Sequence, residues 1–129
     1  MFCAGEQLVA YDDRDLTRPA YQEIGDFAVV TAVAIPYAQA VRDQLGLSDE
    51  DPARIRSAVC LTGRYAAKVY NGEAGLDISP GDLDESIQFL LTYGRSDTVL
   101  PAAELSGFEL VDLFRSGFEQ GLRACDVGV

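Results

Sequence analysis

The side chains of this 129-residue chain that could take part in chemistry are carboxylates, hydroxyls and thiols, because the sequence contains no histidine. Without an imidazole, Ser79, Ser96 and Ser106 have no base to activate them, which excludes a serine-type triad. A Ser–Lys pair would depend on Lys68 alone, with no motif around it. A cysteine nucleophile also normally needs a histidine partner. The residue types therefore argue against nucleophilic catalysis.

Acidic groups at two places suggest calcium binding or general acid–base work: Asp12 and Asp13, and then Asp82, Asp84 and Glu85. Neither group follows the D-x-[DN]-x-[DN]-G pattern of a calcium loop. The second group includes the end of a Ser-Pro-Gly-Asp sequence that is typical of a helix start, where Asp82 acts as a cap. We interpret both groups as solvated surface carboxylates.

The three cysteines, Cys3, Cys60 and Cys125, are widely separated and form no C-x-x-C pair. A tetrahedral zinc site made of cysteine needs four ligands, usually in close pairs, so the chain cannot build one by itself. From spacing alone, one disulfide with a free thiol and three reduced, buried cysteines are both open.

The net charge of −11 limits the partners. Binding to nucleic acid requires clustered Lys and Arg, and an anionic membrane surface attracts the same residues, so neither partner is expected. The acidity is adequately explained as a charge that keeps the domain in solution.

Length and composition indicate a single domain, 1–129, with a hydrophobic core; 48% of the residues are hydrophobic. The longest mostly apolar run, residues 27–40, is too short and too interrupted for a transmembrane helix. The N-terminus lacks the basic and apolar regions of a signal peptide. We expect the chain to be the C-terminal part of a longer protein.

The elements that must position any site are mostly helices, each marked by a capping residue or early proline and by a glycine near its end. In chain order, the predicted elements are a strand in 7–13, a short helical segment in 17–24, and helices in 25–46, 51–72, 79–94 and 106–121. The fold class is therefore mainly α (α+β), with a small β element near the N-terminus.

The predicted helix 25–46 is apolar nearly all round. Pro36 lies in its interior, where it removes a backbone hydrogen bond at a cost of roughly 3 kcal/mol, so we expect a kink or a split there. The helix predicted at 51–72, capped by Asp51, has an inward-facing stripe consisting of Ile55, Val59, Thr62, Ala66 and Val69.

Several short motifs follow one another along nearly the whole chain. They are Gly25-Asp26-Phe27-Ala28, Cys60 followed by Gly63, Pro80-Gly81-Asp82 with Glu85, and Phe114-Arg115 with Gly117-Phe118-Glu119, Gly121 and Cys125-Asp126. In this order the chain resembles the neutral zinc metallopeptidase family of bacteria. The resemblance implies a zincin-like helical domain.

The differences from that family fall on its chemistry. In a zincin, two histidines one helical turn apart hold zinc, and the glutamate between them activates a water molecule. When the chain is aligned with the family, Ile35 and Gln39 replace the two histidines, Pro36 replaces the catalytic glutamate, and Ile55 replaces a downstream glutamate. Isoleucine cannot bind a metal, glutamine is a weak neutral ligand, and proline cannot accept a proton. We therefore expect a pseudo-metallopeptidase with no metal, no cofactor and no catalytic residue.

The resemblance leaves several possibilities for what the domain binds. Gln39, Tyr37 and Tyr65 are candidate ligand-binding residues around the vacated cleft, although a paired amide and core aromatics would be ordinary. We expect an interaction or regulatory module whose partner is an unidentified protein or peptide. The alternatives are a hydrolase with an altered, unrecognised active site and a small-ligand-binding domain that uses the cleft.

The family's export implies an oxidising environment, in which we expect a Cys60–Cys125 disulfide and an unpaired Cys3. The same resemblance implies an extracytoplasmic location. The domain would be secreted, or attached to a membrane through an N-terminal segment that is missing from this sequence.

Overall fold

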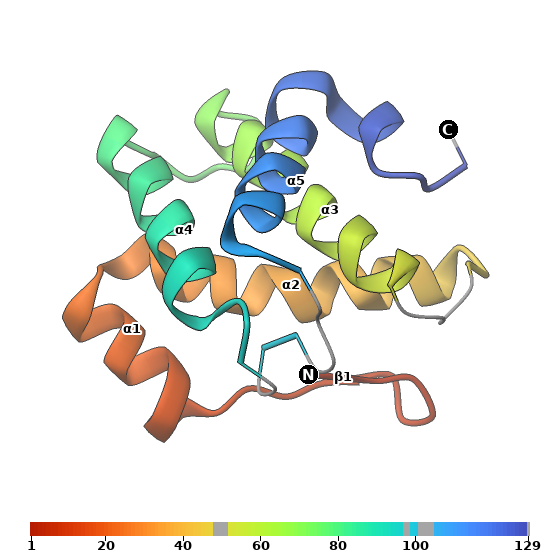
Figure 1. Cartoon of the computed structure of the whole chain (residues 1–129), viewed down its shortest axis with the longest axis horizontal. Helices are drawn as coiled ribbons and strands as arrows, with labels where there is room; N and C mark the ends of the chain where they lie inside the picture. Colours follow the sequence, from red (N-terminus) through yellow and green to blue (C-terminus); the bar gives the residue numbers. More distant parts are fainter. Residues whose placement is uncertain (48–51, 97–98, 101–104, 129) are drawn as a thin grey trace.

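The computed structural model describes residues 1–47, 52–96, 99–100 and 105–128 (Figure 1). The helical elements are η1 (Asp13–Thr17), α1 (Arg18–Glu23), α2 (Asp26–Gln44), α3 (Ala53–Tyr70), α4 (Pro80–Tyr93), α5 (Gly107–Gln120) and η2 (Gly121–Ala124). Strands β1 (Phe2–Cys3) and β2 (Leu8–Val9) form an antiparallel pair, with Phe2 opposite Val9. The fold is therefore mainly α with a small N-terminal β element, as the sequence predicts.

The predicted strand 7–13 is longer than the observed one. Strand β2 ends at Val9, and a π-helical turn, η1, begins at Asp13. Asp12 favours this turn because its Oδ1 accepts a hydrogen bond from the backbone N–H of Asp15 at 2.9 Å. Asp13 pairs with Arg18 at 2.7 Å, and the Arg18 hydrogen bond lowers the pKa of Asp13. This acidic pair thus has a local structural role.

Helix α2 lies at the centre of the molecule and contacts α1, α3, α4 and the β-hairpin (Figure 1). It continues through Pro36 as one helix and does not split, so of the two expected outcomes only a kink at Pro36 stays a prediction. Ala32, Ile35 and Ala38 are buried on both sides of the proline, and this packing offsets the missing backbone hydrogen bond.

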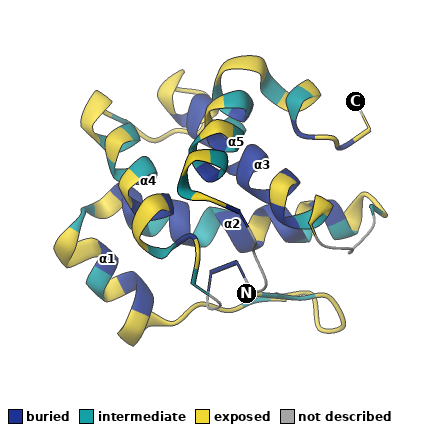
Figure 2. Ribbon diagram, in the orientation of Figure 1, coloured by how far each residue is buried: buried dark blue, intermediate teal, exposed yellow. Residues whose placement is uncertain are grey.

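The core lies between α2 and the helices around it, and the buried faces in Figure 2 point toward this centre. The predicted stripe of α3 is confirmed, because all five of its residues are buried. In α4, Phe89 and Leu90 are fully buried, whereas Leu91 is 52% exposed. The inward face of α4 therefore includes Phe89 and Leu90, and Leu91 faces solvent.

Two glycines allow α3 and α5 to pack with their backbones in contact. A Cβ atom at Gly63 would collide with the carbonyl oxygen of Phe114, and one at Gly117 would collide with that of Cys60. The two sites lie on facing helices, so each glycine makes room for the other helix. This close approach is why no larger residue fits at either position.

The predicted capping sequences form as expected in the described residues. The backbone N–H of Ser79 donates to Asp82 at 2.7 Å, and that of Ser106 donates to Glu109 at 2.8 Å. Pro52 directly precedes α3, and Asp51, its predicted cap, lies outside the described residues.

Replacing Gly63 or Gly117 with alanine tests the close helix contact. Helix propensity alone would favour alanine by about 1 kcal/mol. We expect the backbone collision to outweigh this gain and to lower the free energy of unfolding by about 2 kcal/mol or more. Gly81→Ala is the matched control, because its Cβ would meet only the Ser79 hydroxyl at 3.7 Å. Urea titration should show little change for the control, and an equally mild effect at all three sites would contradict the packing.

Glu109 should make the stability depend on pH. The backbone N–H of Ser106 lowers the pKa of Glu109 below its ordinary value of 4.5. The folded state therefore favours the carboxylate, so the resulting stabilisation is present above pH 4.5 and is lost as the pH falls through the lower folded-state pKa. We expect wild type to be more stable than Glu109→Gln at neutral pH, with the two converging in acid. A constant difference in free energy of unfolding across this range would contradict the assignment.

Candidate functional site

The four positions that the resemblance aligns with the zinc machinery of a zincin are all buried. Ile35 and Ile55 are 0% and 1% exposed and belong to the same core cluster. Pro36 is buried beside Ile35 in α2, and Gln39 is 5% exposed one turn later. Packed side chains, three of them apolar, therefore fill these four positions.

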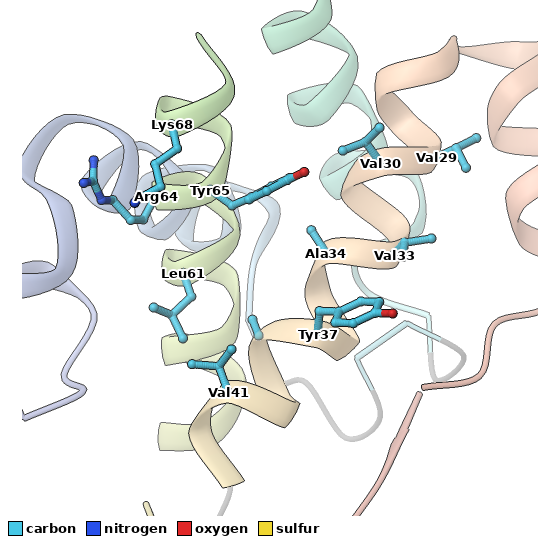
Figure 3. Close-up of a pocket in the computed structure, with 11 residues that line it drawn as sticks. Val29, Val30, Val33, Ala34, Tyr37, Val41, Leu61, Arg64, Tyr65 and Lys68 are labelled. Atoms are coloured by element: carbon cyan, nitrogen blue, oxygen red, sulfur yellow. The ribbon is translucent and has the colours of Figure 1, made fainter. Parts of the chain in front are cut away.

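An apolar groove lies on another face of α2, between α2 and α3 (Figure 3). Its volume is about 680 Å³. Its lining includes residues at successive turns of both helices: Val29, Val33, Tyr37 and Val41 of α2, and Leu61 and Tyr65 of α3. None of Ile35, Pro36, Gln39 and Ile55 is among the lining residues.

The structure brings two of the three candidate ligand-binding residues together. Tyr37 and Tyr65 are 58% and 38% exposed, and both line the groove. In Figure 3, Tyr65 projects from α3 toward α2. Gln39 is buried away from the groove. The two tyrosines are thus surface aromatics rather than the core residues that their helical spacing would ordinarily suggest.

The groove residues Val29, Val33 and Val41 were not predicted as site residues. The available signal was the apolar character of α2 on all sides, since a helix with more apolar surface than its neighbours can cover leaves one face open. The sequence does not reveal which face remains open, because that depends on how α3 and α4 pack.

The charged residues lining the groove are both basic. Lys68 lies 3.8 Å from Glu73 in a half-exposed ion pair. The Nε of Arg64 is buried and has no hydrogen-bond partner in the described part of the chain. Arg64 also lines a second, polar hollow near the end of α5, together with Asn71 and Arg123. Its aliphatic part therefore lies between an apolar and a polar surface.

Cys60 and Cys125 form a disulfide, and Cys3 is a free, partly buried thiol. Both disulfide cysteines are 1% exposed and pack with Val127, so the bond fastens the C-terminal tail to α3. The predicted pairing is confirmed. A disulfide is typical of an oxidising environment outside the cytoplasm.

The beginning of α2 is held by a side chain from α4. The Glu85 carboxylate accepts a hydrogen bond from the backbone N–H of Phe27 at 2.8 Å. Gly25 has a φ of +156°, a backbone conformation that L side chains rarely adopt, which favours glycine at this position. Deeper in the same interface, the hydroxyls of Thr31 and Ser86 are 2.8 Å apart. Residues from two motifs of the resemblance therefore meet in a structural contact.

A group of carboxylates lies beside this contact. One oxygen each from Asp26, Asp82 and Glu85 lies within 4.8 Å of the others, the one such group found among the described residues. Asp82 and Glu85 already accept backbone N–H groups, those of Ser79 and Phe27. Helix N-termini favour negative charge, so capping accounts for this arrangement.

Comparison of the chain with family models, curated proteins and solved structures finds no significant match. Among the described helices, none has both the length and the hydropathy needed to cross a membrane.

Removing the disulfide should destabilise the fold. The bond joins residues 65 positions apart, for which loop-closure entropy alone gives about 4 kcal/mol. We expect Cys60→Ala with Cys125→Ala to lower the free energy of unfolding by about 2–4 kcal/mol. Cys3→Ser is the control and should leave it nearly unchanged. Thiol titration of the denatured wild type should give one free thiol, and three would show that the disulfide does not form.

Proposed function

We propose that this chain is a zincin-like domain without peptidase activity that acts as an interaction or regulatory module of a bacterial envelope protein. The observation that carries the proposal is the burial of Ile35 and Ile55 in one core at positions where the family would hold zinc. A metal site needs ligating atoms around an accessible position, and these side chains supply neither.

The motif residues that the chain does share with the family support the same view. Gly63 and Gly117 allow α3 and α5 to touch, and Glu85 caps α2 beside Gly25. These contacts maintain a fold and contribute no reactive group. A chain that keeps the structural residues of an enzyme while its reactive positions become core has the features of a scaffold.

The groove between α2 and α3 is the surface that best suits binding. It carries exposed aromatic side chains, Tyr37 and Tyr65, on an apolar floor. Tyrosine is enriched at protein interfaces because it combines a large apolar surface with a polar end. We therefore assign the binding of a protein or peptide partner to this groove.

The volume of the groove favours a second candidate, a small apolar ligand. About 680 Å³ falls within the range of small-molecule sites. Such a ligand would raise the melting temperature in proportion to the logarithm of its concentration once binding saturates, which a thermal-shift screen measures.

The proposed location follows from the disulfide and from the resemblance. The Cys60–Cys125 bond favours an oxidising compartment. We propose that the domain is extracytoplasmic, and that it is either secreted or attached to the membrane by an N-terminal segment of a longer protein.

Metal content and turnover test the absence of catalysis. We expect the purified domain, dialysed against zinc, to carry much less than one equivalent by elemental analysis and to cleave no member of a broad peptide library. Glu85→Gln serves as a control for adventitious binding, because it alters the carboxylate group near α2 without touching the zincin positions. Stoichiometric zinc that survives this substitution, or metal-dependent cleavage, would favour a hydrolase with an altered site.

A further inference from the structure

One face of α2 remains without a covering element among the described residues. Helices α1, α3 and α4 and the β-hairpin cover the other sides. The open face carries Tyr37 and Val41, which are 58% and 46% exposed, beside Tyr65 of α3. An apolar stripe of this kind on an otherwise packed helix is typical of a surface that another molecule covers.

The shape of the groove suits a helix. Val29 and Val41 of α2 are twelve positions apart in the sequence, or about 18 Å at a rise of 1.5 Å per residue. In Figure 3, α2 and α3 run in opposite directions along its two sides. A third helix can lie in such a groove with its apolar face down and its polar face in water. An acyl chain is a less suitable occupant than a helix, because a groove this exposed would leave much of the apolar surface of the acyl chain in contact with water.

The charges at the groove favour acidic residues on that helix. The chain has 21 acidic and 10 basic residues, yet the charged residues lining the groove, Arg64 and Lys68, are both basic. Their aliphatic stems extend the apolar wall, and Figure 3 shows their charged ends pointing away from α2. A carboxylate on the partner would meet these ends at the outer edge of α3.

We propose that the groove binds an amphipathic helix of a partner protein. This inference rests on the proposed function and names its partner class. The helix presents apolar residues at i, i+3 or i+4, and i+7 over about three turns, and acidic residues along the edge that faces Arg64 and Lys68. A second copy of this chain is the less favoured occupant, because two molecules that each carry −11 repel one another.

Selection from a displayed library of helical peptides of about 15 residues tests the proposal. The target is the intact chain, and the counter-target is the double variant Tyr37→Asp with Val41→Asp. Both changes are at exposed positions, so circular dichroism should confirm an unchanged fold. We expect enriched peptides to share the apolar spacing and to carry Asp or Glu on one side of it.

Measured affinities of an enriched peptide give the decisive comparison. The double variant should weaken binding about tenfold or more, as expected for central apolar contacts. Lys68→Glu should weaken it a few-fold and reduce its salt dependence. Tyr21→Asp, an equally exposed tyrosine of α1 outside the groove, is the matched control and should have no effect.

Several outcomes would overturn this inference. In the selection, these outcomes are equal enrichment on the counter-target, and enriched peptides that lack the helical spacing or carry basic residues in place of acidic ones. In light scattering, the outcome is a dimer of the intact chain that the double variant does not form. These results would leave the absence of zinc and cleavage untouched. Conversely, stoichiometric zinc or turnover would refute the proposed function without changing which peptides the groove selects.

Discussion

The contact between the backbones of α3 and α5 determines how the other parts of the structure are placed. Gly63 and Gly117 bring the two helices together, and Cys60, beside this contact, forms the disulfide with Cys125. Helix α3 also buries Ile55 and Val59 in the core that it shares with α2, and its Leu61 and Tyr65 line the groove between the two helices. The position of α3 against α5 therefore affects the groove, because α3 forms one of its two walls.

Features that depend on local chemistry could be predicted from the sequence. Ser106 and Glu109 form a capping box because three residues separate them, and the stripe of α3 follows from helical period alone. The Cys60–Cys125 pairing came from the resemblance, since spacing could not choose among three cysteines. By contrast, the strand after Gln7 is shorter than predicted, because Asp12 starts a helical turn.

The site was harder to predict because it depends on tertiary packing. Gln39 and Tyr37 are both polar groups on an apolar helix, and their sequence context does not separate them. The fold buries the first to 5% exposure and leaves the second 58% exposed. Similarly, no local signal shows that Val29, Val33 and Val41 line a groove, since the same spacing describes a core-facing stripe. Only the arrangement of α3 beside α2 distinguishes these cases.

The burial of Ile35 and Pro36 and the open groove have a common physical origin in the apolar composition of α2. A helix that carries metal ligands must keep one face polar and accessible, whereas Ile35 and Pro36 of α2 are buried. Burying them adds apolar surface to the core, worth about 25 cal/mol for each Å² removed from water. A helix that is apolar all round in a domain of this size then has more apolar surface than five helices can cover. The surplus lies at Tyr37 and Val41, on the side of α2 that lines the groove.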